Sequence, residues 1–255
     1  MKKIFSITAI LFCIIFGSFY LYLYCNYEVP ILMYHSIDSS KVNSYAAVSR
    51  DNFQSQMDFI KQNRYNVISF YDYCRMLKEN LPIPRKSVII TFDDGYKDNL
   101  KAIKVLKEHD FPAVFFIIFD KIGRQGYLSA EDISNFIEIP GLEIGSHTLS
   151  EAYLPEIGEE QLKQEIFDSK EKLEDKFNRK IRIFSYTSGG FNEKAISLVK
   201  DADYYCACTT NRGFDRKLQP YALRRIKITD NDNGFTLWAK LSGFYNIFKK
   251  PKSPF

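Results

Sequence analysis

Residues 87–95 read Ser-Val-Ile-Ile-Thr-Phe-Asp-Asp-Gly. The first six residues form an apolar, β-branched run that predicts a buried strand. Asp93 and Asp94 follow at its carboxyl end, and Gly95 permits a turn that approaches a ligand closely. Two adjacent carboxylates at the end of a buried strand are unfavourable unless a positive charge compensates them, and a divalent metal ion would do so. The alternative is that one aspartate caps the next helix while the other is solvated.

On both sides of this stretch, short apolar runs alternate with segments of helical period. The expected strands are 29–35, 67–70, 87–92, 113–119, 142–146, 181–186, 204–209 and 223–228, and the expected helices are 51–63, 71–79, 98–108, 130–137, 159–177, 193–200 and 234–242. This alternation predicts an α/β fold with a mainly parallel sheet, and roughly eight repeats of it favour a barrel. His35, Asp93, Asp94 and His147 all come at or just after carboxyl ends of strands, where barrel enzymes place their active sites.

The N-terminus differs in composition from the rest of the chain. Residues 4–25 carry no charge, which predicts one membrane-spanning helix. Lys2 and Lys3 precede this segment, so the positive-inside rule places the body on the extracytoplasmic side of a single-pass membrane protein. A cleaved signal peptide is the alternative, although Tyr22 and Tyr24 are poor cleavage-site residues. The expected organisation is an anchor over 1–25, one globular domain over 26–248 and a basic tail over 249–255.

Charge and cysteine content exclude two further classes. The net charge is +4, and subtracting the five charges of Lys2, Lys3, Lys249, Lys250 and Lys252 leaves −1 for the body. A nearly neutral body lacks the basic stripe of a nucleic-acid-binding protein, so we expect no nucleic-acid partner. The five cysteines do not form a disulfide framework, and Cys206 and Cys208 are interpreted as small buried hydrophobic residues.

The three histidines differ in their sequence context. His109 comes late in a predicted helix, where a solvated or dipole-facing imidazole is expected. His147 directly follows the strand predicted over 142–146, and Glu151 comes four residues later. If a helical turn begins there, both side chains share a face and could bind one metal ion with Asp94.

Three motifs then occur in order: Thr91-Phe-Asp-Asp-Gly95, Ser146-His-Thr-Leu-Ser-Glu-Ala-Tyr-Leu154 and Phe184-Ser-Tyr-Thr-Ser-Gly-Gly-Phe-Asn192. Together they resemble the polysaccharide deacetylase (NodB-homology, carbohydrate esterase 4) family over residues 30–245. The opening Pro30-Ile-Leu-Met-Tyr-His-Ser36 is similar to the circularly permuted branch that includes poly-N-acetylglucosamine deacetylases. The resemblance implies a deformed (β/α) barrel of about seven to eight strands with an open groove for a sugar chain.

The resemblance also implies roles for the motif residues. Asp93 matches the general base that activates a metal-bound water, while Asp94 and His147 match metal ligands. Glu151 stands where most members have a second histidine ligand, so it is the third candidate ligand of one divalent ion. Zn²⁺ is expected first, with Co²⁺, Ni²⁺ and Mn²⁺ as alternatives, because a carboxylate in place of an imidazole weakens the selection for zinc.

The third motif and the C-terminal strand depart from the family pattern. Many members have an arginine at the position of Ser185 and a proline at that of Thr187. The backbone N–H that stabilises the oxyanion matches Ser188, and such a donor survives side-chain substitution. Conventional members place a general-acid histidine in a Leu-any-His pattern, whereas this chain reads Leu223-Arg-Arg-Ile226. His35 matches the acid of the permuted branch; otherwise it is a strand-end histidine satisfied by its neighbours.

Aromatic residues make up 16% of the chain, and most of them must be core. Tyr153, Phe191 and Trp238 are the candidates for a sugar-binding groove. The expected function is metal-dependent removal of N-acetyl groups from an N-acetylated amino-sugar polysaccharide of the cell surface or cell wall, with surface-polysaccharide synthesis machinery as a further partner. The alternatives are an O-deacetylase and a catalytically impaired glycan-binding or assembly protein, which the departures at Ser185, Thr187 and Glu151 would favour.

Overall fold

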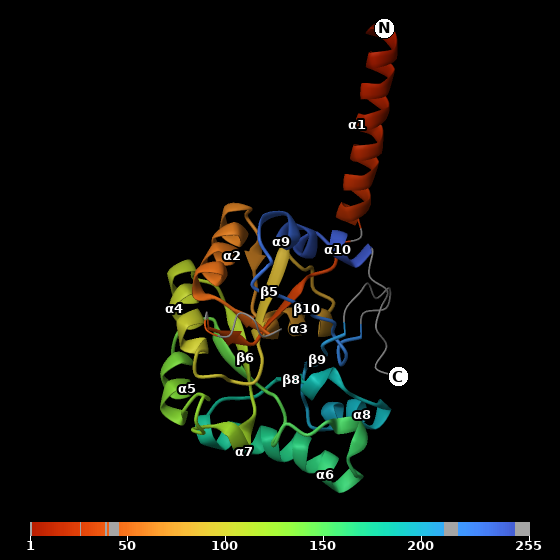
Figure 1. The fold of residues 1–255 in the computed structure, drawn as a ribbon. Coiled ribbons are helices and arrows are strands. Elements are labelled where there is room, and N and C mark those ends of the chain that lie inside the picture. Colours follow the sequence, from red (N-terminus) through yellow and green to blue (C-terminus); the bar gives the residue numbers. More distant parts are fainter. Residues whose placement is uncertain (1, 26, 39, 41–45, 212–218, 248–255) are drawn as a thin grey trace.

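A curled sheet of parallel strands forms the centre of the protein (Figure 1). The structure is a computed structural model that describes residues 2–25, 27–38, 40, 46–211 and 219–247. The sheet has the order β10-β1-β5-β6-β7-β8-β9, and β4 also pairs with β5. Its strands are β1 (Ile31–Tyr34), β4 (Asn66–Val67), β5 (Ser87–Phe92), β6 (Ala113–Ile117), β7 (Leu142–Ser146), β8 (Ile183–Ser185), β9 (Cys206–Cys208) and β10 (Ile226–Lys227). Every pairing in it is parallel, so the sheet is a curled half-barrel of the predicted α/β class.

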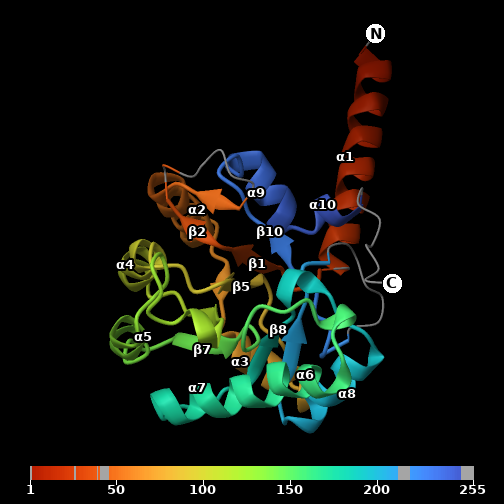
Figure 2. The same ribbon diagram turned by 60° about the horizontal axis from the view of Figure 1, so that its bottom comes forward.

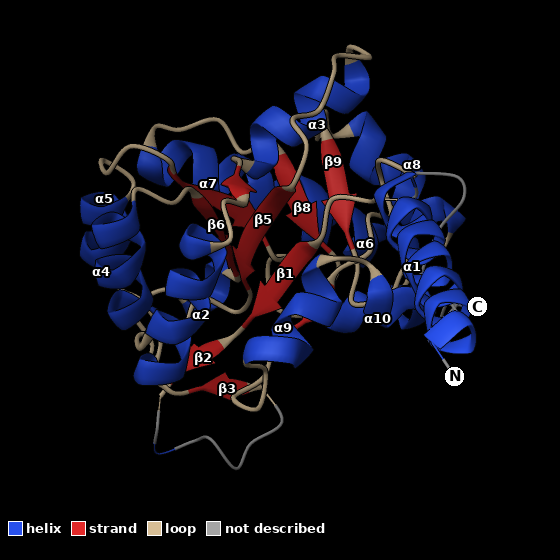
Figure 3. Ribbon diagram, turned by 90° about the horizontal axis from the view of Figure 1, so that it is seen from above, coloured by secondary structure: helices blue, strands red, loops and turns tan. Residues whose placement is uncertain are grey.

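Helices surround the strands (Figure 3). They are α2 (Arg50–Gln62), α3 (Phe70–Lys78), α4 (Asn99–His109), α5 (Ala130–Phe136), α6 (Glu159–Lys163), α7 (Ser169–Phe177), α8 (Glu193–Asp201), α9 (Gly234–Leu241) and α10 (Phe244–Ile247). Polar caps set several of the starts: the side chains of Ser49, Ser69, Ser129 and Asn192 accept backbone N–H groups at the beginnings of α2, α3, α5 and α8. Helices α6, α7 and α8 lie at the end of the body opposite α9 (Figure 2).

Two details differ from the sequence prediction. A small second sheet pairs β2 (Ser36–Ile37) with β3 (Ala47–Val48). The helix predicted over 159–177 is interrupted by the π-helical segment η4 (Gln164–Asp168). These features are too short to produce a periodic pattern in the sequence.

The two faces of the sheet pack in separate clusters. Residues that alternate along a strand point to opposite faces, and β5 shows this clearly: Ile90 and Phe92 belong to the large cluster beneath the surrounding helices, whereas Ile89 belongs to a smaller cluster with α3. Helix α3 therefore fills the concave side of the sheet. The next inward positions after Ile89 are Thr91 and Asp93, so the sheet directs Asp93 towards the carboxyl-end mouth of the half-barrel.

A disulfide bond joins Cys74 of α3 to Cys206 of β9. Cys206 is buried, as interpreted, but the interpretation as a small hydrophobic residue missed its bond to Cys74. The error arose because Cys74 and Cys206 are 132 residues apart, while their Cα atoms lie 5.8 Å apart in the fold, within the range of a disulfide. Cys208 is buried and free, as expected.

The N-terminal helix α1 (Lys2–Cys25) projects from the body beside α9 and α10 (Figure 1). Phe19 of α1 contacts Phe244 of α10 with 5.8 Å between the ring centroids. Among the residues that the structure describes, no helix has the combined length and apolarity needed to cross a membrane. The membrane anchor over residues 1–25 stays a prediction, and the basic tail over 249–255 lies outside the described residues.

Candidate active site

Four polar residues predicted from the sequence meet at the carboxyl ends of neighbouring strands. His35 follows β1, Asp93 and Asp94 follow β5, and His147 follows β7. The sheet pattern continues into these residues: the N–H of Asp93 donates to the carbonyl of Tyr34 at 2.9 Å, and the N–H of His147 extends the pairing with β6. Parallel strands end at one edge of a sheet, which is why residues 112 positions apart share one site.

Asp94 and His147 are placed as a pair of metal ligands would be. Their Oδ1 and Nε2 atoms lie 3.4 Å apart, and two ligands of a tetrahedral ion at about 2.0–2.1 Å from it are separated by about 3.3 Å. Nδ1 of His147 lies 2.8 Å from the carbonyl oxygen of Ser185. A carbonyl accepts, so Nδ1 carries a proton, which leaves Nε2 as the nitrogen that would bind a cation beside Asp94.

Glu151 does not join this pair. Its carboxylate forms an ion pair with Lys121, which follows β6 in the short helix η2 (Phe119–Lys121). Among the described residues, no three histidine, cysteine, aspartate or glutamate side chains cluster closely enough to hold a metal ion. The donor set thus fits a divalent cation at two positions, and Lys121 holds the third candidate ligand away from them.

Asp93 is bound by a residue that the sequence analysis did not identify as functional. Arg225 donates from Nη1 to Oδ1 at 2.7 Å and from Nη2 to Oδ2 at 2.6 Å. Both side chains are buried. Burial alone would raise the pKa of Asp93, but the guanidinium charge of Arg225 and the neighbouring His147 lower it to about 2. Asp93 is therefore an oriented carboxylate that stays ionised across the neutral pH range.

His35 follows β1 and, within the described part of the chain, has one ring nitrogen without a hydrogen-bond partner. Its Nδ1 is buried and has no hydrogen-bond partner among the described residues. Burial lowers the pKa of the imidazole, although Asp93 and Asp94 oppose the effect. An unpaired buried nitrogen is costly and marks a position where a substrate or water group is expected. The backbone is fixed by Asn99, whose Nδ2 donates to the carbonyl of His35 at 2.6 Å.

The third motif forms a tight turn beside the site. Ser188 is exposed in the 3₁₀ helix η5 (Thr187–Gly189) and has a left-handed φ of 53°. The adjacent Gly189 has φ +74°, and a Cβ there would lie 2.1 Å from Oγ1 of Thr210. The ring of Tyr153 covers Gly190 so closely that a Cβ on this glycine would lie 2.1 Å from its Cε2. The retained glycines therefore let the turn pack against Thr210 and Tyr153.

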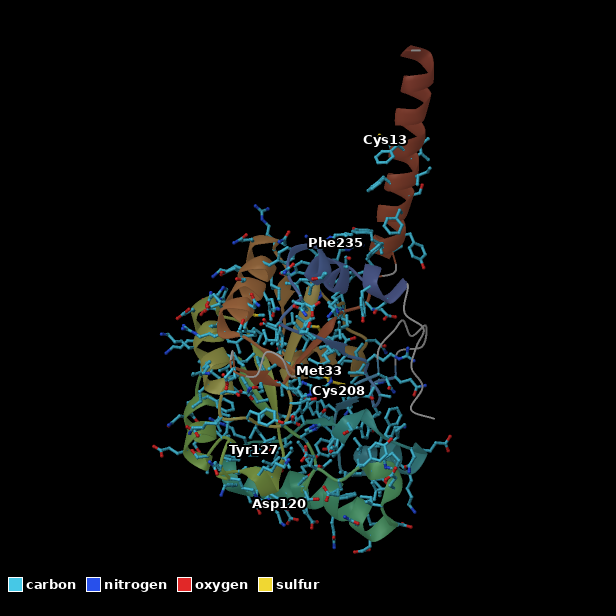
Figure 4. The ribbon with its side chains drawn as sticks, in the orientation of Figure 1. Cys13, Met33, Asp120, Tyr127, Cys208 and Phe235 are labelled. Carbon is cyan, nitrogen blue, oxygen red and sulfur yellow. A yellow bond between two sulfur atoms is a disulfide. The ribbon has the colours of Figure 1, made fainter. Side chains whose placement is uncertain are left out.

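The three aromatic candidates for a groove lie in different surroundings. Tyr153 is 41% exposed next to the motif turn, whereas Phe191 is 5% exposed and stacks on Tyr186 in the core. Trp238 contacts Phe235 and Phe244 on α9 and α10. Phe235 marks this cluster at the end of the body nearest α1 (Figure 4). Only Tyr153 is both exposed and adjacent to the site.

A buried glutamate supports the loop that follows His147. Glu165 lies in the π-helical segment η4, and its Oε2 accepts the N–H groups of Leu149 and Ser150 at 2.9 Å each. Thr148 and Glu151 in the same loop have φ values of 69° and 75°. Since non-glycine residues adopt such values at a cost, the contacts to Glu165 offset part of the strain.

The sequence contains a signal for Arg225 but hardly any for Lys121 or Glu165. Arg225 comes two residues after Leu223 in a predicted strand, so the two side chains are expected on the same inward face. A charged residue at such a buried position is nearly always paired. Its partner could not be named because Asp93 lies 132 positions away. Lys121 and Glu165 stand in segments rich in charge, where a solvated side chain is the ordinary interpretation.

Comparisons with known proteins relate the chain to one family and one fold. Residues 80–207 match the family model "Polysaccharide deacetylase". The Bacillus subtilis (strain 168) protein YxkH is 32% identical over 209 residues, which cover 81% of this chain and 74% of YxkH. The Streptococcus pyogenes deacetylase PplD, solved in complex with acetate, superposes with a TM-score of 0.78 at 26% identity, covering 85% of this chain and 99% of PplD. IcaB from Ammonifex degensii shares the fold, with a TM-score of 0.74 at 23% identity over 86% of this chain and 97% of IcaB.

Proposed function

Because the chain belongs to the polysaccharide deacetylase family, we propose that it removes N-acetyl groups from an N-acetylated amino-sugar polysaccharide. One observation carries the proposal: a fixed carboxylate, a carboxylate–histidine pair and an unpaired imidazole meet at the mouth of the half-barrel, as Asp93, Asp94 with His147, and His35. Amide hydrolysis needs a group that orients water and a group that returns a proton to the leaving amine.

Asp93 orients the attacking water. Each of its oxygens receives one N–H of Arg225 and keeps a further lone pair for a water proton. A carboxylate with a pKa of about 2 holds a proton only weakly. The proton that water loses must therefore move on, and the C–N bond breaks when the amide nitrogen receives it.

His35 completes this transfer. Since burial lowers its pKa, the resting imidazole is neutral at pH 7 and can donate only after it has received a proton. We assign to it the passage of the water proton to the amide nitrogen. The products are acetate and a free amine, and the acetate bound to PplD fits such an acetyl-binding site.

Asp94 and His147 are the residues that would hold a divalent cation, and Glu151 is the candidate third ligand. Bound there, an ion would supply Lewis acidity that polarises the acetyl carbonyl and lowers the pKa of water. We propose Zn²⁺ first, and Co²⁺, Ni²⁺ or Mn²⁺ as substitutes. The N–H of Ser188 is the proposed donor to the developing oxyanion, because the turn of η5 exposes this residue beside the site.

The polymer is proposed to lie across the mouth, with the exposed ring of Tyr153 as a stacking surface for a sugar. We further propose that the body acts outside the cytoplasm, held to the membrane by residues 1–25, close to surface-polysaccharide synthesis machinery. The disulfide between Cys74 and Cys206 supports an oxidising compartment. The permuted poly-N-acetylglucosamine branch remains our proposed place within the family, supported by His35 as the acid.

The test is acetate release by the full chain from N-acetylglucosamine oligomers, with and without added Zn²⁺ or Co²⁺. We expect metal-stimulated release, its abolition by Asp93→Asn, and a strong loss with His35→Gln. Release that resists chelation, or that persists in Asp93→Asn, would contradict this mechanism. A parallel assay with O-acetylated oligomers separates an esterase from an amidase, and release from those oligomers alone would assign O-deacetylation.

A second candidate is a glycan-binding protein without turnover, and the ion pair between Lys121 and Glu151 favours it because it withdraws the third ligand. Such a protein would retain oligomers on an affinity gel yet release no acetate at any metal concentration. Equilibrium dialysis gives an independent measurement: an active enzyme should retain about one equivalent of metal, whereas a site with only two ligands should lose it.

A further inference from the structure

Arg225 is the feature that neither the motifs nor the family model explains. Its guanidinium is buried and uses all five N–H donors: two bind Asp93, and the other three bind Oγ1 of Thr91 at 3.1 Å, Oγ of Ser185 at 2.9 Å and the carbonyl of Thr209 at 3.2 Å. A buried cation whose five donors are all paired can take only one orientation.

Two departures from the family pattern meet at this residue. Arg225 occupies the third place of Leu223-Arg-Arg, where conventional members have the histidine of the Leu-any-His pattern. Ser185 occupies the place where many members have an arginine, and its hydroxyl touches Nη2 of Arg225. Ser185 in β8 and Arg225 just before β10 are thus in contact, and the same Nη2 of Arg225 also binds Asp93.

We propose that Arg225 is the positioning residue of Asp93, and that an arginine at position 185 could hold this carboxylate in its place, because the side chains at positions 185 and 225 are in contact. The inference rests on the proposed deacetylase function and deepens it. Asp93 is 1% exposed, so water cannot replace the lost partner if Arg225 is removed. Without the two parallel N–H bonds, the carboxylate could rotate about its side-chain dihedrals and would no longer face the attacking water.

The arginine at position 225 also explains why His35 is needed as the acid. A site with arginine at position 225 has no room there for a histidine acid, and the described residues contain no other imidazole at the mouth besides that of His147, which is engaged with Ser185 and Asp94. His35 reaches the site from β1, which lies between β10 and β5 in the sheet. The acid and the positioning cation therefore approach Asp93 from adjacent strands.

The experiment compares four variants of the full chain with the wild type. Arg225→Ser removes the cation, and Arg225→Lys retains the charge without the two-pronged geometry. The pair Ser185→Arg with Arg225→Ser exchanges the two side chains and keeps the composition of the site. Arg224→Ser is the matched control, because it removes the same side chain and charge one position earlier, where the arginine is only half-buried.

We expect Arg225→Ser to lower kcat on the order of 100-fold, the effect of misplacing a reacting group, while KM changes little. Arg225→Lys should fall between it and the wild type, and the exchanged pair should regain at least about tenfold of the lost kcat. Thermal melting and near-ultraviolet circular dichroism report folding for each variant. A purely structural role predicts that kcat follows the melting temperature instead.

Three outcomes would overturn the inference: folded Arg225→Ser with a wild-type kcat, an exchanged pair that recovers stability without recovering kcat, or a loss in Arg224→Ser equal to that in Arg225→Ser. If Arg225→Ser does not fold, Arg225→Lys and the exchanged pair decide by the same criteria. A wild-type chain that releases no acetate refutes the proposed function itself, so the two failures are distinguished in one assay.

Discussion

Removing the disulfide between Cys74 and Cys206 should cost the protein a large share of its stability. The bond closes a loop of 132 residues. In the chain-entropy treatment, a crosslink over such a loop stabilises the folded state by about 5 kcal/mol at about 25 °C, and measured losses typically reach about 2–5 kcal/mol. Both cysteines are fully buried, and they join α3, which fills the concave side of the sheet, to β9.

The assay is urea unfolding of the wild type, with and without dithiothreitol, beside the double variant Cys74→Ala, Cys206→Ala. We expect reduction to lower the free energy of unfolding by about 2–5 kcal/mol, and the double variant to be insensitive to the reductant. Cys25→Ala is the control, because Cys25 is exposed and free. A wild-type intact mass that corresponds to five free thiols, or a reductant effect below about 1 kcal/mol, would refute the reasoning.

Two further predictions concern charged groups. Lys121→Met should release Glu151 from its ion pair and strengthen Zn²⁺ binding, measured by isothermal titration calorimetry. The expected gain is up to about fivefold, which corresponds to the free energy of a partly exposed ion pair. Unchanged or weaker binding would show that Glu151 is no ligand. Burial raises the pKa of Glu143 from 4.5 to about 6, so the folded state binds the extra proton and stability falls as the pH rises through this window. Glu143→Gln should accordingly raise the free energy of unfolding by up to about 2 kcal/mol at pH 7.5 and leave it unchanged at pH 4, and an equal gain at both pH values would contradict this cause.

The sheet could be predicted from the sequence because its strands are continuous apolar runs. Strand β7 (Leu142–Ser146) and strand β5 (Ser87–Phe92) have the expected bounds, since buried parallel strands contain hydrophobic residues on both faces. The carboxyl ends of these strands also identified Asp93, Asp94 and His147 as one group. The sequence shows which residues end each strand, and in a parallel sheet these ends lie side by side.

Partnerships across the sheet could not be predicted in this way. The contact of Arg225 with Asp93, the ion pair of Lys121 with Glu151 and the bond of Cys74 with Cys206 join segments that are 30 to 132 residues apart. No periodicity encodes such a pair, because each member looks ordinary in its own segment. Glu151 illustrates the consequence: its spacing from His147 suggested a shared helical face, but a left-handed φ of 75° breaks the turn and directs the carboxylate to Lys121.

Departures from a family pattern therefore need to be interpreted in pairs rather than singly. Ser185 alone would indicate an impaired site, because many members have an arginine at this position. Arg225 alone would indicate the loss of the acid. Together they leave Asp93 with two N–H donors, at 2.7 and 2.6 Å, and leave His35, whose Nδ1 is buried without a partner among the described residues, as the proposed acid. At Glu151 the departure is different, because its partner Lys121 holds the carboxylate in an ion pair and opposes metal binding. Whether Glu151 can bind a metal ion therefore decides whether this site is active.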